Sequence, residues 1–344
     1  MKKNLSRAVL ALLTLPLGLM AASPIVIAHR GASGYLPEHT LAAKALAHAM
    51  GADYLEQDVV LTKDGVPIIL HDIHLDGTTD VEAKFPGRAR EDGHYYAIDF
   101  TLDEVRQLNA HERQSERTGE LVFPQRFGLG LARLPVPTLE EEIDFIQRLN
   151  RTTGRNAGLY VELKQPTFHT REGQDIAAIV AELLARYGYA QADDKCYIQC
   201  FESGALKQLR EAGCELPLVQ LIGRPGSEGD PQDDFAAMQT PDGLKQVATY
   251  ANGLGPSIGQ VIAPDEDGTY RPLPLTADAH RAGLVIHPYT LRRDSLPDGI
   301  SEDDLFKLLF HTAAIDGLFT DFPDDAVNYW VKKGGQPLGE VRLR

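Results

Sequence analysis

The sequence predicts an α/β fold, a TIM-type (β/α)8 barrel with a small inserted subdomain after the second strand. Eight short apolar or β-branched runs recur along the chain, and each is followed by a segment with helical patterning. The length of 344 residues suits one large barrel as well as two average domains, and the 31 Gly and 21 Pro indicate many turns. An open doubly wound sheet is the main alternative fold.

The first 22 residues are expected to form a secretory signal peptide. Lys2, Lys3 and Arg7 precede an apolar run of 13 residues that ends at Met20. That run is shorter than the roughly 20 apolar residues that span a bilayer, so no stable membrane anchor is expected. The prediction is a periplasmic protein whose mature chain, residues 23–344, is a single barrel domain.

The charge balance argues against nucleic acid as a partner. The chain has 34 Lys and Arg against 49 acidic residues, a net charge of −15, which becomes −15 minus 3, or −18, without the signal peptide.

Three cysteines are too few for a disulfide scaffold. Cys196 and Cys200 share one expected strand, where residues four apart are separated by about 13 Å, so both are interpreted as core residues.

The repeating units follow in order. The eight expected barrel strands are residues 25–29, 54–59, 159–163, 196–201, 217–222, 253–255, 284–289 and 317–322. Thr40 is placed to cap a helix that stops at Gly51, and Thr138 with Glu141 has capping-box spacing. Further helices are expected at residues 174–187, 203–212, 240–251, 276–282, 301–314 and 323–333.

Two stretches interrupt this repeat. Residues 66–72 (VPIILHD) predict an extra strand that a turn at 62–65 folds back as a hairpin. Residues 73–137 are expected to form a polar insertion on the barrel rim, with one helix at 101–108. Its scattered aromatic residues are interpreted as a local core rather than a membrane surface; they are Phe85, Tyr95, Tyr96, Phe100 and Phe123.

Acidic side chains stand where the active site of such a barrel lies, at the ends of strands. Glu56 and Asp58 are two apart on one strand and share a face, and Glu162 comes from the next barrel strand. Three converging carboxylates would repel one another without a cation, and hard oxygen ligands suit Ca²⁺, or Mg²⁺, better than Zn²⁺. Pairing of these acids with nearby Lys or Arg is the alternative.

Basic side chains also end the strands. His29 and His71 are suited to proton transfer near neutral pH, and Arg30 and Lys164 would bind an anion such as a phosphate. Gly31 is expected where the backbone passes close to a ligand. Four other residues near strand ends or a helix start are kept outside the catalytic set, with support, capping or pocket lining as their expected roles: His39, His287, Tyr289 and Asp321.

Seven motifs together resemble the glycerophosphodiester phosphodiesterase family, and most closely its bacterial periplasmic branch. They are HRGASGYLPEHT (29–40), YLEQD (54–58), ILHD (69–72), ELK (162–164), QCF (199–201), HPYT (287–290) and LFTDFP (318–323). The similarity extends from about residue 25 to residue 333. It departs at residues 222–240 and in the insertion, which leaves the preferred alcohol group open.

The resemblance implies a TIM barrel, one divalent cation that is commonly Ca²⁺, and a small-molecule substrate. The implied reaction is hydrolysis of glycerophosphodiesters, such as glycerophosphocholine and glycerophosphoethanolamine, to sn-glycerol 3-phosphate and an alcohol. By position, His29 and His71 resemble the acid–base pair, Arg30 the phosphate ligand, Lys164 the charge-stabilising lysine, and Glu56, Asp58 and Glu162 the metal carboxylates.

Two other functions remain open from the sequence. A non-catalytic periplasmic binding protein for phosphorylated polyols would need the metal and Arg30 but not both histidines. A different phosphodiesterase on the same scaffold would act on a polymer such as teichoic acid, or on a lysophospholipid.

Overall fold

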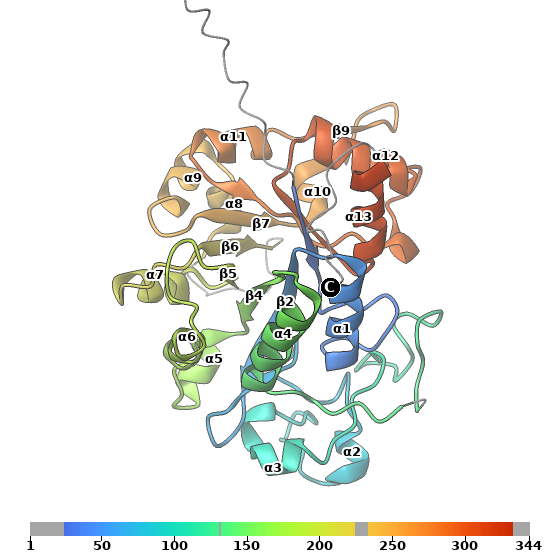
Figure 1. The fold of residues 1–344 in the computed structure, drawn as a ribbon, viewed down its shortest axis with the longest axis vertical. Helices are drawn as coiled ribbons and strands as arrows, with labels where there is room; N and C mark the ends of the chain where they lie inside the picture. The colour runs from blue at the N-terminus through green and yellow to red at the C-terminus, as the bar shows by residue number, and fades with distance from the viewer. Residues whose placement is uncertain (1–23, 131, 224–232, 333–344) are drawn as a thin grey trace, which may run out of the picture.

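The strands of the protein form a nearly closed, eight-stranded parallel barrel. The computed structural model describes residues 24–332 except 131 and 224–232, so the expected signal peptide lies outside the described residues. The barrel strands follow the order β10-β7-β6-β5-β4-β2-β1-β11, and all neighbours along this path are parallel. Figure 1 shows the strands at the centre with helices around them.

The strands agree with the expected runs to within a few residues. The barrel strands are β1 (Ile25–Ala28), β2 (Tyr54–Leu61), β4 (Gly158–Leu163), β5 (Cys196–Cys200), β6 (Leu218–Ile222), β7 (Gly253–Pro256), β10 (Val285–Ile286) and β11 (Gly317–Thr320). β3 (Pro67–Ile69) pairs antiparallel with β2, which confirms the expected hairpin. A second hairpin, β8 (Ile262–Pro264) with β9 (Tyr270–Pro272), was not expected.

The barrel closes between β10 and β11. The segment that follows β10 accepts a hydrogen bond from Phe319 N at Pro288 O (3.0 Å) and donates one from Leu291 N to Phe319 O (2.8 Å). An open doubly wound sheet would leave these two strands as unpaired edges. The closure therefore confirms the barrel and excludes that alternative.

The helices begin and end at residues with clear physical reasons. They are α1 (Leu41–Met50), α2 (Val81–Lys84), α3 (Leu102–Val105), α4 (Leu139–Thr153), α5 (Pro166–Arg171), α6 (Ile176–Arg186), α7 (Ser203–Glu211), α8 (Phe235–Met238), α9 (Pro241–Val247), α10 (Ile258–Val261), α11 (Leu275–Arg281), α12 (Glu302–Lys307) and α13 (Pro323–Lys332). The Thr40 side chain caps α1, which ends at Gly51 with φ 100°, and Thr138 with Glu141 forms the expected capping box of α4.

Several helix expectations need correction. The helix expected at 240–251 ends at Val247, and the one expected at 301–314 divides into α12 and a wider π-helical turn, Leu308–Thr312. Four short helices, α2, α5, α8 and α10, were not expected. With four to six residues each, they are too short to show a helical period in the sequence.

The insertion has its own hydrophobic core. Residues 73–137 carry α2, α3 and a 3-10 helix at Ala97–Asp99, at the lower edge of Figure 1. The expected helix at 101–108 is shorter, because only α3 is α-helical behind the Thr101 cap. Phe100 is fully buried and Tyr95 nearly so within this core, and Phe85 and Tyr96 pack against it, which confirms the interpretation as local core for these four. Phe123 is not part of this core and instead lies beneath the guanidinium of Arg126.

A layer of large side chains fills the barrel interior beneath the site. Its members are Ile27, Tyr54, Tyr160, Val219 and Phe319. The rings of Tyr160 and Phe319 meet edge to face at 4.9 Å, so the barrel is packed rather than hollow at this depth.

The three cysteines are free, and Cys196 and Cys200 are buried as expected. None of the described helices is both long and apolar enough to cross a membrane.

Candidate active site

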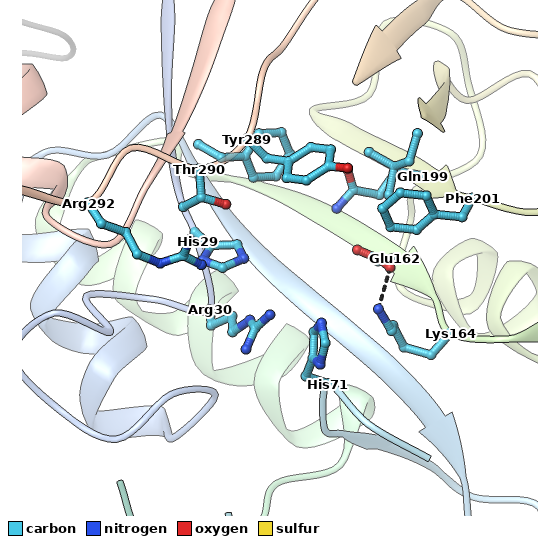
Figure 2. Close-up of a pocket in the computed structure, with 12 residues that line it drawn as sticks. His29, Arg30, His71, Glu162, Lys164, Gln199, Phe201, Tyr289, Thr290 and Arg292 are labelled. Atoms are coloured by element: carbon cyan, nitrogen blue, oxygen red, sulfur yellow. Dashed lines mark hydrogen bonds and ion pairs between the residues drawn. The ribbon is translucent and has the colours of Figure 1, made fainter. Parts of the chain in front are cut away.

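One cavity at the carboxyl ends of the strands collects five of the seven predicted site residues. It has a volume of about 180 Å³ and is lined by His29, Arg30, His71, Glu162 and Lys164, among others. Figure 2 shows these side chains around the cavity, which residues from β5, β6 and the segment after β10 complete. The other two predicted residues, Glu56 and Asp58, do not line the cavity and are each 1% exposed.

Strand register explains why the acids converge. Asp58 on β2 lies opposite Glu162 on β4, and Glu56 precedes Asp58 by two residues. Paired residues on neighbouring parallel strands point to the same face, so all three side chains extend toward the barrel interior. The two-residue spacing in the sequence therefore predicted correctly that Glu56 and Asp58 share a face of β2.

The three acids nevertheless have different neighbours. Ligand atoms of Glu56, Asp58 and His39 all lie within 4.8 Å of one another, in a group that could hold a metal ion and that does not include Glu162. The Glu162 carboxylate instead accepts a hydrogen bond from Lys164 Nζ at 2.7 Å. His39 is a contributor that the sequence placed only in a supporting or capping role.

Electrostatics sets Glu56 and Asp58 apart. Burial and the charge of Asp58 raise the pKa of Glu56 well above its usual range. Burial also acts to raise the pKa of Asp58, but Lys164 and His71 outweigh it and hold that pKa well below its usual range. Asp58 Oδ2 lies 2.7 Å from His39 Nε2, whereas the buried Oδ1 has no hydrogen-bond partner. An unsatisfied buried carboxylate oxygen beside a second, crowded carboxylate fits a cation site.

His29 is held from behind by an aspartate. Its Nδ1 lies 2.7 Å from Asp321 Oδ1, and Asp321 Oδ2 accepts hydrogen bonds from Arg126 and Arg292, both at 2.8 Å. Burial, followed by the charge of Arg30, lowers the pKa of His29 to about 4 despite this aspartate. The ring is therefore neutral near pH 7, and with Nδ1 bound to Asp321 its Nε2 is the proton-accepting atom.

His71 has an equivalent partner. Its Nδ1 lies 2.6 Å from Asp72 Oδ1, and Asp72 Oδ2 accepts a hydrogen bond from Arg113 Nη1 at 2.6 Å. Burial and the charge of Arg30 lower the pKa of His71 as well. Two imidazoles, each oriented by an aspartate that an arginine holds, thus face one cavity.

Arg30 is fixed between these groups. Its φ of 58° is left-handed, its backbone N–H donates to Glu56 Oε2 at 2.5 Å, and its Nη1 donates to Glu38 Oε1 at 2.9 Å. Gly31 has φ 85°, and a Cβ there would lie 2.8 Å from the backbone of Ala43, so its conformation and its packing against helix α1 already require a glycine. The expected approach of this backbone to a ligand stays a prediction.

The insertion supplies two arginines that the sequence did not predict for the site. Arg113 binds both Asp72 and Glu38, and Arg126 binds both Asp321 and Asp294. Both stand in irregular loops, where no periodicity marks the direction of a side chain. Asp321 was noted in the sequence as a partner or a helix cap, and it is a hydrogen-bond partner of His29.

The structure thus combines a TIM barrel with a cavity at the carboxyl ends of its strands, the usual place of the active site in this fold, lined by two histidines, three basic side chains and Glu162. The chain belongs to the glycerophosphoryl diester phosphodiesterase family, whose model matches residues 29–325. It has the activity of a glycerophosphodiester phosphodiesterase, so the alternative of a non-catalytic binding protein is excluded.

Three relatives illustrate the match. A glycerophosphodiester phosphodiesterase of Haemophilus influenzae is 40% identical over 329 residues, which is 90% of each chain. A crystal structure from Silicibacter pomeroyi, provisionally named a glycerophosphoryl diester phosphodiesterase, is 25% identical with a TM-score of 0.68 and covers 91% of this chain and 95% of its own. An Oleispira antarctica phosphodiesterase, solved with its product sn-glycerol-3-phosphate, has a TM-score of 0.60 at 23% identity and covers 89% of this chain and 96% of its own.

Proposed function

We propose that the protein hydrolyses glycerophosphodiesters such as glycerophosphocholine and glycerophosphoethanolamine to sn-glycerol 3-phosphate and an alcohol, by histidine acid–base catalysis that depends on a divalent cation. The observation that carries this proposal is the pair of histidines, His29 and His71, each oriented by an aspartate and both lining one cavity. The product bound by the Oleispira antarctica relative is the one expected here.

Glu56, Asp58 and Glu162 are the residues that would hold the cation, with Ca²⁺ as the proposed ion and Mg²⁺ as the alternative. When bound, the cation would offset negative charge on the phosphoryl oxygens. The unsatisfied Asp58 Oδ1 and the crowding of Glu56 support this assignment. His39 orients Asp58 through their 2.7 Å contact.

Arg30 and Lys164 would bind the remaining phosphate oxygens. Both line the cavity, and each is also tied to a carboxylate, Arg30 to Glu38 and Lys164 to Glu162. Such anchoring reduces the entropy lost when a substrate is ordered and holds the donors where charge develops.

The two imidazoles would share the proton transfers. Nε2 of one takes the proton from the nucleophile, which by family resemblance is the neighbouring glycerol hydroxyl, so that a cyclic phosphate forms as the alcohol leaves. The other donates its proton to the departing alcohol oxygen, and water later opens the ring. Both rings are neutral in the free protein, and the negative charge of the bound diester raises the pKa of the ring that must donate.

We further propose that the protein acts in the periplasm as a mature chain of residues 23–344. The support is the basic start and the 13-residue apolar run of the sequence. Sequencing the N-terminus of protein recovered from a periplasmic extract tests this localisation.

The activity is tested by incubating purified protein with glycerophosphocholine and glycerophosphoethanolamine, with Ca²⁺ or with excess EDTA, and measuring glycerol 3-phosphate. Release with Ca²⁺ that EDTA abolishes is the expected result. Glu56→Gln should lose activity at limiting Ca²⁺, whereas Glu120→Gln, an exposed change in the insertion, should not. No release from either diester would overturn the substrate class, and activity that survives exhaustive chelation would overturn the metal.

A further inference from the structure

A second group of metal-ligating side chains lies in the insertion and outside the cavity. Its members are His74, Asp76, His94 and Glu116, none of which lines the proposed active site. An antiparallel bridge between His74 and Tyr96 brings the first three together. Ligand atoms of His74, His94 and Glu116 all lie within 4.8 Å of one another.

Hydrogen bonds inside the group do not explain this arrangement. His94 Nδ1 lies 3.7 Å from Asp76 Oδ1 and 3.8 Å from Glu116 Oε2, and His74 Nδ1 lies 3.9 Å from Glu116 Oε1. All three distances are too long for a hydrogen bond. His94 Nδ1 and His74 Nε2 are buried atoms without a hydrogen-bond partner, and native proteins rarely leave buried ring nitrogens unpaired.

We propose that this group is a second metal site that binds Zn²⁺ through His94, His74, Glu116 and Asp76. Two imidazoles with carboxylates are a zinc donor set, whereas Ca²⁺ prefers oxygen ligands alone. Bonds of about 2.0–2.2 Å place the ligand atoms of a tetrahedral zinc roughly 3.3–3.6 Å apart. The observed separations of 3.7–3.9 Å become compatible through small side-chain rotations.

Neighbouring contacts hold the ligands in place. Asp76 Oδ2 accepts a hydrogen bond from Tyr95 N at 3.0 Å, which leaves Oδ1 directed at His94. The two imidazole rings lie parallel with centroids 4.3 Å apart, and Tyr96 packs edge-on against His74.

The bound ion would join parts of the insertion that are distant in sequence. His74 and Asp76 follow the β2–β3 hairpin, His94 lies about 20 residues further on, and Glu116 is three residues after Arg113. Arg113 binds Asp72, the partner of His71. The site would therefore stiffen the loop that carries this arginine, without touching the reacting groups.

Zinc binding is measured directly, with no recourse to activity. Mature protein is stripped of metal, saturated with Ca²⁺ so that the oxygen site is filled, and titrated with Zn²⁺ against a chromogenic chelator. The variants are His94→Ala and Glu116→Gln in the proposed site, Glu120→Gln as an exposed control in the same loop, and Glu56→Gln to remove a ligand of the other site. Substitution with Co²⁺ reports geometry through its visible absorption.

One Zn²⁺ per chain is expected for the wild type, Glu120→Gln and Glu56→Gln, with tetrahedral Co²⁺ bands. His94→Ala and Glu116→Gln should weaken Zn²⁺ binding at least about tenfold, comparable with losses at known metal sites. Zn²⁺ should also raise the Tm of the wild type but not of His94→Ala. Wild-type affinity in His94→Ala, or loss of the zinc signal in Glu56→Gln, would overturn the proposal. His94→Gln replaces His94→Ala under the same criteria if the alanine variant does not fold.

Discussion

At the scale of single residues, each histidine in the cavity works with a carboxylate that does not itself line it. Asp321 fixes the tautomer of His29 and Asp72 fixes that of His71, both through Nδ1. The aspartate also stabilises the imidazolium that forms when the ring takes a proton. Asp321 and Asp72 are thus positioning residues, and they explain how buried, neutral rings can act as bases.

Asp321→Asn is expected to lower kcat roughly 100-fold or more. The amide cannot stabilise a protonated His29, and it allows the wrong tautomer. Steady-state kinetics with glycerophosphocholine measures this loss. Asp294→Asn is the matched control, because Asp294 also pairs with Arg126 whereas the carboxylate bound to His29 Nδ1 is that of Asp321. Equal kcat in the two variants would contradict the role of Asp321.

The pH dependence of kcat/KM follows from the lowered pKa values of the histidines. As the pH falls, activity should be lost only when the base becomes protonated, which for His29 occurs near pH 4 rather than near the ordinary imidazole value of 6.5. The acid limb of the profile should therefore lie well below pH 6.5. A half-maximal point at pH 6.5 or above would show that neither buried ring is the base.

The sequence predicted which residues meet but not everything that holds them. Five of the seven predicted residues line one cavity and the other two, Glu56 and Asp58, are buried on neighbouring strand positions, because strand ends and two-residue spacing determine which side chains point into a parallel barrel. His39, which comes just before the Thr40 cap of α1, also lies beside the acids. Its own backbone has a left-handed φ of 63°, which local sequence does not predict. Arg113 and Arg126 reach the site through loops, whose course depends on tertiary packing rather than on local pattern.

At the scale of elements, the insertion supports the proposed active site. It packs on its own core yet sends Arg113 to the Asp72 side of the cavity and Arg126 to the Asp321 side. Both histidine–aspartate pairs are therefore supported by one segment that is absent from a minimal barrel. The sequence predicted that the insertion lies on the barrel rim, but it did not predict that the insertion provides arginine partners for Asp72 and Asp321.

Arg126→Gln should lower kcat about tenfold and move the acid limb of the pH profile upward. Removal of the guanidinium leaves more of the Asp321 charge uncompensated, which raises the pKa of His29 toward its usual value. A pH–rate profile distinguishes this from simple destabilisation, which would not shift the limb. Arg106→Gln, in the same insertion and paired with Glu141, is the control and should leave the profile unchanged.

Element prediction succeeded where local signals are strong. The apolar runs, the Thr40 cap and the Thr138 capping box are short-range features that survive in the fold. The division of α12 from the π-helical turn at Leu308–Thr312 has no such signal. Packing of Phe306 and Phe310 against Tyr329 of α13 accompanies that division, and such contacts are not visible in one segment alone.

At the scale of the whole molecule, a strongly acidic chain builds a locally cationic cavity. The net charge is −15, yet Arg30, Lys164 and Arg292 line the same 180 Å³ space. Beneath them, Glu56 and Asp58 are buried side by side, an arrangement that costs free energy until a cation is bound. Metal binding and folding are therefore expected to be coupled.

Ca²⁺ should stabilise the fold measurably. At 100 times its Kd, binding adds about 2.7 kcal/mol to the free energy of unfolding and raises Tm by several degrees. In Glu56→Gln this shift should be lost, and the metal-free variant should melt no lower than the metal-free wild type because the amide replaces a buried carboxyl group that Asp58 crowds. Calorimetry with Ca²⁺ or EDTA measures both. A wild-type Ca²⁺ shift in the variant would place the ion elsewhere.

The most direct test of the account compares His29→Ala and His71→Ala on two substrates, glycerophosphocholine and a glycerophosphodiester of nitrophenol. Loss of a general acid or base costs roughly 10² to 10⁴ in rate, so both variants should fail on the choline ester. Nitrophenol leaves without protonation, so only the variant that lacks the acid should recover on the second substrate. Near-normal turnover of glycerophosphocholine by both variants would contradict the central claim.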